Sequence, residues 1–120
     1  MPATQFIVYV TDITRSTELY RALLGLDPDF VTPGFVTFPL DEQVKLSLWI
    51  GGETVPTPDL PRVSEVCLTL TGGRAAIEAH LDAWAELDVA VVEPLRDAVF
   101  GPTFVVADPD GNRIRVAPVD

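Results

Sequence analysis

The chain has 120 residues, of which 48% are hydrophobic, and its 18 acidic and 8 basic side chains give a net charge of −10. This length fits one domain, and the hydrophobic content is too high for a disordered chain. The acidic balance disfavours nucleic acids and anionic membranes as partners, because both require clustered Lys and Arg.

Cysteine usage and hydropathy indicate the compartment. Cys67 is the only cysteine, so no intramolecular disulfide can form. The chain shows neither a basic stretch followed by an apolar run at its start nor an apolar run of about 18 residues. We therefore expect a cytoplasmic protein.

The first half of the chain predicts a strand, a helix and three further strands. The strand covers residues 5–10, which are mainly β-branched and aromatic. A helix then begins at Thr11 or Asp12, whose side-chain oxygens can cap it, and ends at Gly25, which suits a left-handed C-cap. The three short strands that follow are predicted at residues 29–32, 35–38 and 44–50.

The second half repeats this plan after a predicted linker, residues 51–62, which is rich in proline and lacks periodicity. The predicted elements are a strand at 65–70, a helix at 73–87 and strands at 89–92, 103–106 and 113–116. The sequence therefore predicts an α+β fold, a single domain of residues 1–120. Its two βαβββ modules, about 4–50 and 63–118, form a cupped mixed sheet with the helices on its outer face.

Alternate side chains in these strands separate into an aliphatic and a polar set. The aliphatic set, expected to face the helices, is Val8, Val10, Leu46, Leu48, Val66, Leu68, Leu70, Ile114 and Val116. The opposite set is Gln5, Tyr9, Lys45, Ser47, Trp49, Glu65, Cys67, Thr69, Arg113 and Arg115. A shift by one residue would put charges into the core, so the register is well determined. We expect the functional site on the polar, concave face.

Two segments resemble the vicinal-oxygen-chelate superfamily, which contains glyoxalases, bleomycin-resistance proteins and dioxygenases. Residues 9–28, YVTDITRSTELYRALLGLDP, resemble the opening strand and helix of these proteins, and residues 104–116, FVVADPDGNRIRV, resemble their closing hairpin. With the duplicated βαβββ order, the resemblance covers about residues 4–118. It is strongest to the bleomycin- and phenazine-resistance type of binding protein, and it implies a homodimer.

The resemblance also places the four metal-ligand positions of the superfamily, at Gln5, Ser47, Glu65 and Arg115. Gln5 and Glu65 have suitable oxygen atoms, but a neutral Ser47 is a poor ligand and Arg115 is a permanent cation without an available lone pair. We therefore expect no metal and no other cofactor. Two alternatives stay open for Arg115: a charge-assisted bidentate pair with Glu65 across the cup, or a solvated position at the rim.

The polar face suggests binding of an aromatic molecule. Trp49 could stack on a flat ligand and Tyr9 could supply a hydroxyl, although packing roles are open for both, whereas Trp84 is predicted to lie in the core. The expected binding residues are Gln5, Tyr9, Ser47, Trp49, Glu65, Phe104, Arg113 and Arg115. We predict metal-independent binding or sequestration of a small hydrophobic, aromatic molecule, as in antibiotic resistance, with no catalytic residues. The alternative is a glyoxalase- or dioxygenase-like lyase or isomerase that uses Glu65 as its base.

Overall fold

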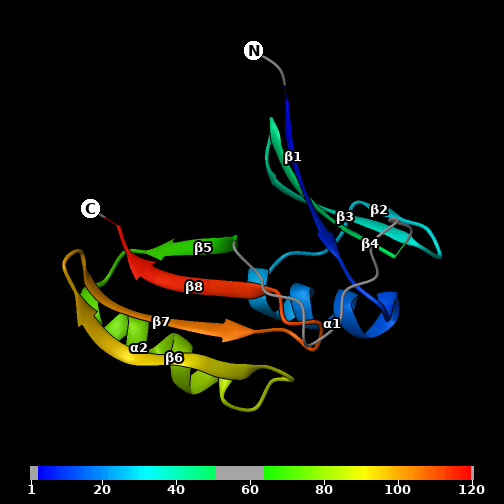
Figure 1. Cartoon of the computed structure of the whole chain (residues 1–120). Helices are drawn as coiled ribbons and strands as arrows, with labels where there is room; N and C mark the ends of the chain where they lie inside the picture. The colour runs from blue at the N-terminus through cyan, green and yellow to red at the C-terminus, as the bar shows by residue number, and fades with distance from the viewer. Residues whose placement is uncertain (1–2, 51–63, 120) are drawn as a thin grey trace. The chain divides into compact units, whose positions relative to one another are not determined.

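The computed structural model describes residues 3–50 and 64–119. The chain divides into two compact units, Met1–Thr57 and Pro58–Asp120. Each unit contains one strand, one helix and three further strands in that order (Figure 1). The predicted α+β fold of two βαβββ modules is therefore confirmed, with the strands arranged in two four-stranded mixed sheets. The predicted linker, residues 51–62, lies outside the described residues.

The first module contains one helix and four strands. Its elements are β1 (Thr4–Tyr9), α1 (Ile13–Leu24), β2 (Phe30–Val31), β3 (Phe35–Asp41) and β4 (Val44–Trp49). The strand order is β1-β4-β3-β2, with β1 parallel to β4 and the other neighbours antiparallel. The predicted helix ends are confirmed: the Asp12 side chain accepts a hydrogen bond from the backbone N–H of Arg15, and Gly25 has a left-handed φ of 67°.

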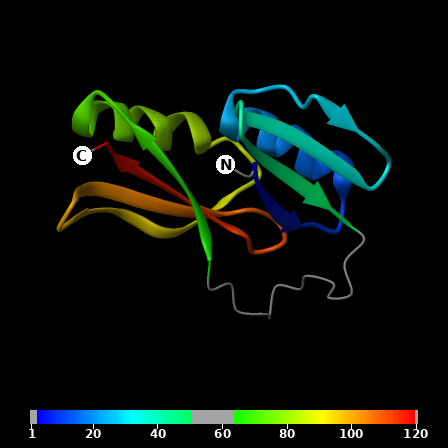
Figure 2. The same ribbon diagram turned by 90° about the horizontal axis from the view of Figure 1, so that it is seen from above.

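Helix α1 covers one face of the first sheet (Figure 2). The buried aliphatic and aromatic side chains of this interface are Leu19, Tyr20 and Leu23 from α1 and Val36, Phe38, Leu46 and Leu48 from β3 and β4. Burial of each such side chain stabilises the fold by about 1.5–3 kcal/mol, so this interface forms the core of the module. The predicted inward positions of Leu46 and Leu48 are confirmed.

The second module repeats the arrangement. Its elements are β5 (Glu65–Leu70), α2 (Gly73–Trp84), β6 (Ala90–Ala98), β7 (Gly101–Ala107) and β8 (Arg113–Pro118). The strand order is β5-β8-β7-β6, with β5 parallel to β8. Helix α2 ends at Trp84 rather than at the predicted residue 87, because the backbone N–H groups of Ala85 and Leu87 each bond the carbonyl three residues earlier and tighten the chain into turns.

The core of the second module lies between α2 and the strands β7 and β8. Ile77 and Trp84 are the buried residues of α2, and the Trp84 ring meets the Phe104 ring edge-on, with centroids 5.8 Å apart. Ile114 and Val116 are also buried, as the alternation predicted. The predicted core position of Trp84 is therefore confirmed.

Strand β6 differs most from the prediction, which ended it at residue 92. It continues to Ala98, and its pairing with β7 shifts by one residue twice, between Val91 and Glu93 and between Glu93 and Arg96. Pro94 interrupts the strand pattern in the sequence, but a proline is tolerated at an irregularity of an edge strand because no ladder hydrogen bond is required from it there. The two shifts act as β-bulges that redirect the side chains beyond them.

Gly25 and Gly101 both have a positive φ but differ in their surroundings. Gly101 has a φ of 122°, and a Cβ atom there would lie 2.9 Å from Cγ of Pro118, whereas a Cβ at Gly25 would meet nothing within 4 Å. In both alanine variants the positive φ lowers the free energy of unfolding by about 1–2 kcal/mol. Only Gly101→Ala adds a steric clash. We predict that Gly101→Ala lowers the free energy of unfolding more than Gly25→Ala, as measured by urea denaturation. Equal losses would contradict the close packing of Gly101 on Pro118.

Candidate functional site

The side chains that alternate with the core residues lie on the face of each sheet opposite its helix. We call these surfaces the first and the second open face. The first open face comprises Gln5, Ile7, Tyr9, Phe30, Phe35, Thr37, Lys45, Ser47 and Trp49. The second open face comprises Glu65, Cys67, Thr69, Glu93, Arg96, Thr103, Arg113 and Arg115. The candidate functional side chains lie on these faces because the opposite faces are filled by the packing of the helices.

A chain of hydrogen bonds crosses the first open face. The Gln5 side-chain amide donates to Oγ of Ser47 at 2.7 Å, and this oxygen lies 2.8 Å from Oγ1 of Thr37. Ser47 and Thr37 are buried, so these contacts satisfy hydroxyl groups that would otherwise be costly to remove from water. These hydrogen bonds join β1, β4 and β3 and fix the position of the Gln5 amide.

An aromatic row lies beside this polar chain. Trp49 pairs with Tyr9 on β1 and with Phe35 on β3, so the three rings follow one another across neighbouring strands. The Tyr9 and Trp49 rings have centroids 5.8 Å apart and are tilted by 33°, and Phe30 packs edge-on against Phe35 at 6.3 Å. Tyr9 is 41% exposed and Phe30 is 54% exposed. The first open face therefore presents aromatic surface on a hydrogen-bonded sheet.

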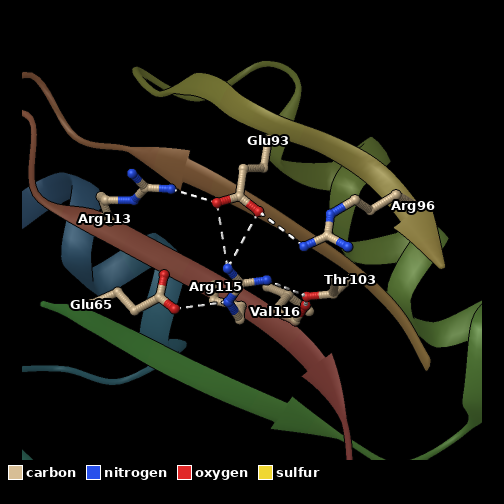
Figure 3. A network of polar contacts seen from close by, with 7 residues as sticks. All are labelled: Glu65, Glu93, Arg96, Thr103, Arg113, Arg115 and Val116. Carbon is tan, nitrogen blue, oxygen red and sulfur yellow. Dashed lines mark hydrogen bonds and ion pairs between the residues drawn. The ribbon is translucent and has the colours of Figure 1, made fainter. Parts of the chain in front are cut away.

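Arg115 is the centre of the second open face (Figure 3). Its Nε donates to Oε1 of Glu65 at 2.8 Å, its Nη1 donates to Oγ1 of Thr103 at 3.1 Å, and its Nη2 lies 3.3 and 3.5 Å from the two carboxylate oxygens of Glu93. The Arg115 side chain is only 16% exposed. Of the two alternatives for Arg115, the structure thus shows the pairing with Glu65. The contact is single rather than bidentate, because the guanidinium divides its donors among three acceptors.

Sequence reasoning missed Glu93, which has the most ionic partners on this face. It accepts a hydrogen bond from Nη2 of Arg113 at 2.6 Å and pairs with Arg96 at 3.7 Å, in addition to Arg115. Without the first bulge in β6, the register would pair Glu93 with Phe104 and turn its carboxylate toward α2; the bulge pairs it with Val105 instead. The nearby signal in the sequence is Pro94, which lies in the second irregularity, between Glu93 and Arg96, and does not mark the first bulge.

Burial and the charged neighbours together shift the pKa values of two groups on this face. The hydrogen bond that Arg115 donates to Glu65 and the negative charges of Glu65 and Glu93 together outweigh burial and raise the pKa of the Arg115 guanidinium. Burial, followed by the charge of Glu65, raises the pKa of the Cys67 thiol, while the charge of Arg115 acts in the opposite direction. The pKa of the Cys67 thiol therefore responds to the opposing charges of Glu65 and Arg115 beside it.

Phe104 stands apart from the other expected binding residues. Its side chain is fully buried against Trp84 on the helix-covered face, so it forms core rather than open surface. The others lie on the two open faces: Gln5, Tyr9, Ser47 and Trp49 on the first, and Glu65, Arg113 and Arg115 on the second. Thr37, Glu93 and Thr103 join them through the contacts described above.

Comparison with known proteins identifies the class to which this arrangement belongs. Residues 3–116 match the Glyoxalase/Bleomycin resistance protein/Dioxygenase superfamily, and the chain belongs to this superfamily. One relative is the phenazine antibiotic resistance protein EhpR of Enterobacter agglomerans, which is 38% identical over 118 residues, covering 95% of this chain and 89% of that protein.

Solved structures agree with this assignment. Protein ATC0852 from Agrobacterium tumefaciens has a TM-score of 0.78 at 31% identity, with 100% of this chain and 98% of that chain covered. A glyoxalase-related enzyme from Fulvimarina pelagi has a TM-score of 0.84 at 16% identity, with 99% and 88% covered, and shows the likeness of the fold alone.

The residues that we expect at the metal-ligand positions of the superfamily do not form a ligand set for a metal ion. In the first module Gln5 donates to Ser47, and in the second module Arg115 donates to Glu65, so two of the four positions are engaged by neighbours that are poor metal ligands. A guanidinium offers no lone pair to an ion and repels it. Within residues 3–50 and 64–119, no group of three or more His, Cys, Asp and Glu side chains is placed to hold a metal.

The reactivity of Cys67 tests the charge balance of the second open face. We predict that Glu65→Gln lowers the pKa of the thiol, because a negative charge that disfavours the thiolate is removed, and that Arg115→Gln raises it, because a stabilising positive charge is lost. The pH dependence of alkylation by iodoacetamide measures both shifts, since the thiolate is the reactive form. Shifts of the same sign in the two variants would contradict the arrangement.

Proposed function

We propose that this protein binds a small planar aromatic molecule on its first open face without a metal ion, and that it sequesters this molecule as a resistance protein would. The observation that carries the proposal is the Tyr9–Trp49 pair, whose rings lie 5.8 Å apart on the face that no helix of the module covers. Aromatic surface of this kind attracts flat apolar ligands because it is costly to keep in water.

The surrounding contacts make this surface suitable for stacking. Each favourable aromatic pair contributes about 0.5–1.5 kcal/mol beyond the buried area. Trp49 lies on β4, which is hydrogen-bonded to a strand on each side, so ligand binding costs little conformational entropy of the backbone. The Gln5 amide uses one N–H for Ser47, which leaves an N–H and a carbonyl oxygen as possible partners for polar atoms of a ligand.

The relative from Enterobacter agglomerans supports the chemical class of the ligand. It is a phenazine antibiotic resistance protein, and phenazine is a planar tricyclic aromatic compound. The net charge of −10 fits a neutral or cationic ligand better than an anionic one. We therefore take phenazine as the first compound to test.

The oligomeric state and the cellular location of the protein belong to the same proposal. The superfamily suggests a homodimer, and the composition favours the cytoplasm, with neither nucleic acid nor membrane as a partner. No helix in the described part of the chain is long and apolar enough to cross a membrane.

The alternative of a lyase or isomerase with Glu65 as its base has no specific observation in its favour. Oε1 of Glu65 accepts the Nε–H of Arg115, so a substrate proton would have to compete with a guanidinium for this oxygen. The binding proposal does not require any residue to change partners.

Tryptophan fluorescence tests the proposed site directly. The chain has two tryptophans, so a Trp84→Phe variant leaves Trp49 as the only indole. We predict saturable quenching of this variant by phenazine, unchanged by EDTA, because Trp49 stacks on the ligand and no metal takes part.

Calorimetry with a matched pair of variants completes the test. We predict that Trp49→Ala weakens phenazine binding at least about tenfold, which corresponds to about 1.4 kcal/mol, whereas Trp84→Phe leaves the affinity unchanged. An unaltered affinity in Trp49→Ala, with the fold intact by circular dichroism, would contradict the proposal.

A further inference from the structure

The second open face holds two carboxylates around one guanidinium. Glu65 and Glu93 both contact Arg115, and the three side chains are only 33%, 30% and 16% exposed. We infer that the Arg115 guanidinium takes the place of a bound cation, and that the same two carboxylates would bind a divalent metal ion if the guanidinium were replaced by a metal-binding side chain. This inference concerns a different face from the proposed aromatic site and is independent of it.

The two carboxylates approach from opposite edges of the sheet. In the strand order β5-β8-β7-β6, Glu65 stands on one edge strand and Glu93 on the other, and Arg115 stands on β8 between them. Glu93 reaches across β7 because the bulge in β6 turns it to this face. Figure 3 shows both carboxylates directed at the Arg115 head group. Their convergence is therefore a property of the backbone as well as of the ion pairs.

Electrostatics requires a cation at this point. Two partly buried carboxylates that share one neighbour repel each other, and the limited exposure of this group weakens the screening by water. Arg115 resolves the repulsion by donating Nε–H to Glu65 and Nη2–H to Glu93, at 2.8 and 3.3 Å. A divalent ion would supply the same compensation through coordination by oxygen. The Arg115 side chain and an ion therefore exclude each other.

Histidine at position 115 would complete a ligand set. An imidazole nitrogen and two carboxylates are three protein ligands of the kinds that Zn²⁺ and Co²⁺ accept, with solvent in the remaining position. Arg113 also bonds Glu93, at 2.6 Å, and would compete with the ion for that carboxylate. An Arg113→Gln change in the same chain removes this competitor and leaves the more distant Arg96, 3.7 Å from Glu93, beside the carboxylate.

The experiment is titration of the full-length protein and its variants with Zn²⁺ by calorimetry, and with Co²⁺ by visible absorption. We expect R115H, alone or with R113Q, to bind one Zn²⁺ at least about tenfold more tightly than the wild type does. A further E65Q or E93Q change should reverse this gain. The matched control is R113H, which places a histidine on the same strand and face but keeps Arg115, and we expect it to bind no more tightly than the wild type.

Several outcomes would overturn the inference. These are Zn²⁺ binding by the wild type as tight as that by R115H, an equal gain in R113H, or a gain that survives both E65Q and E93Q. If R115H is unfolded without metal, Zn²⁺ should restore its circular dichroism spectrum, because binding to the native state drives folding. Failure of Zn²⁺ to restore the fold, or a folded R115H without a gain in affinity, would equally refute it. The phenazine titration reports on Trp49, so either proposal can fail alone.

Discussion

The structure depends on the two-residue alternation of side chains along its strands. Each sheet presents one face to its helix, and that face is aliphatic and aromatic throughout its core positions. Every polar side chain of the site must then lie on the other face, because a shift of one residue would place Arg115 or Glu65 under a helix without partners. The positions of the candidate residues follow from the burial of residues such as Leu46, Leu48, Ile114 and Val116.

The two modules use this common plan for different chemistry. Tyr9 pairs with Trp49 across the parallel strands of the first module, whereas the corresponding pair in the second module is Thr69 and Ala117. The first open face is therefore aromatic, and the second carries the network of ion pairs around Arg115. A duplicated fold thus provides one face suited to stacking and one face with internally compensated charge.

Much of this arrangement could be predicted from the sequence where the alternation within one strand decides which face a side chain takes. Alternation placed Trp49 and Arg115 on the polar face, whereas the contact of Arg115 with Glu65 was one of two alternatives. The structure decides for this contact because the two residues take diagonal positions on the paired strands β5 and β8. Glu93 could not be predicted in the same way, because two bulges change the register of β6 with β7. Phe104 was expected in the site, but it pairs with Val116 and therefore lies on the core face. The register of the β7–β8 hairpin sets this orientation, and the identity of the residue does not reveal it.

The central claim is that the Tyr9–Trp49 pair on the first sheet, in which Tyr9 is exposed and Trp49 is half-buried, receives a flat ligand. A nitrogen–proton correlation NMR titration with phenazine locates the contact residue by residue. The account predicts the largest changes at the indole N–H of Trp49 and at backbone amides of residues 7–9 and 47–49, which neighbour the Tyr9–Trp49 pair. Changes concentrated around Trp84 and α2, with the Trp49 indole signal unmoved, would contradict it.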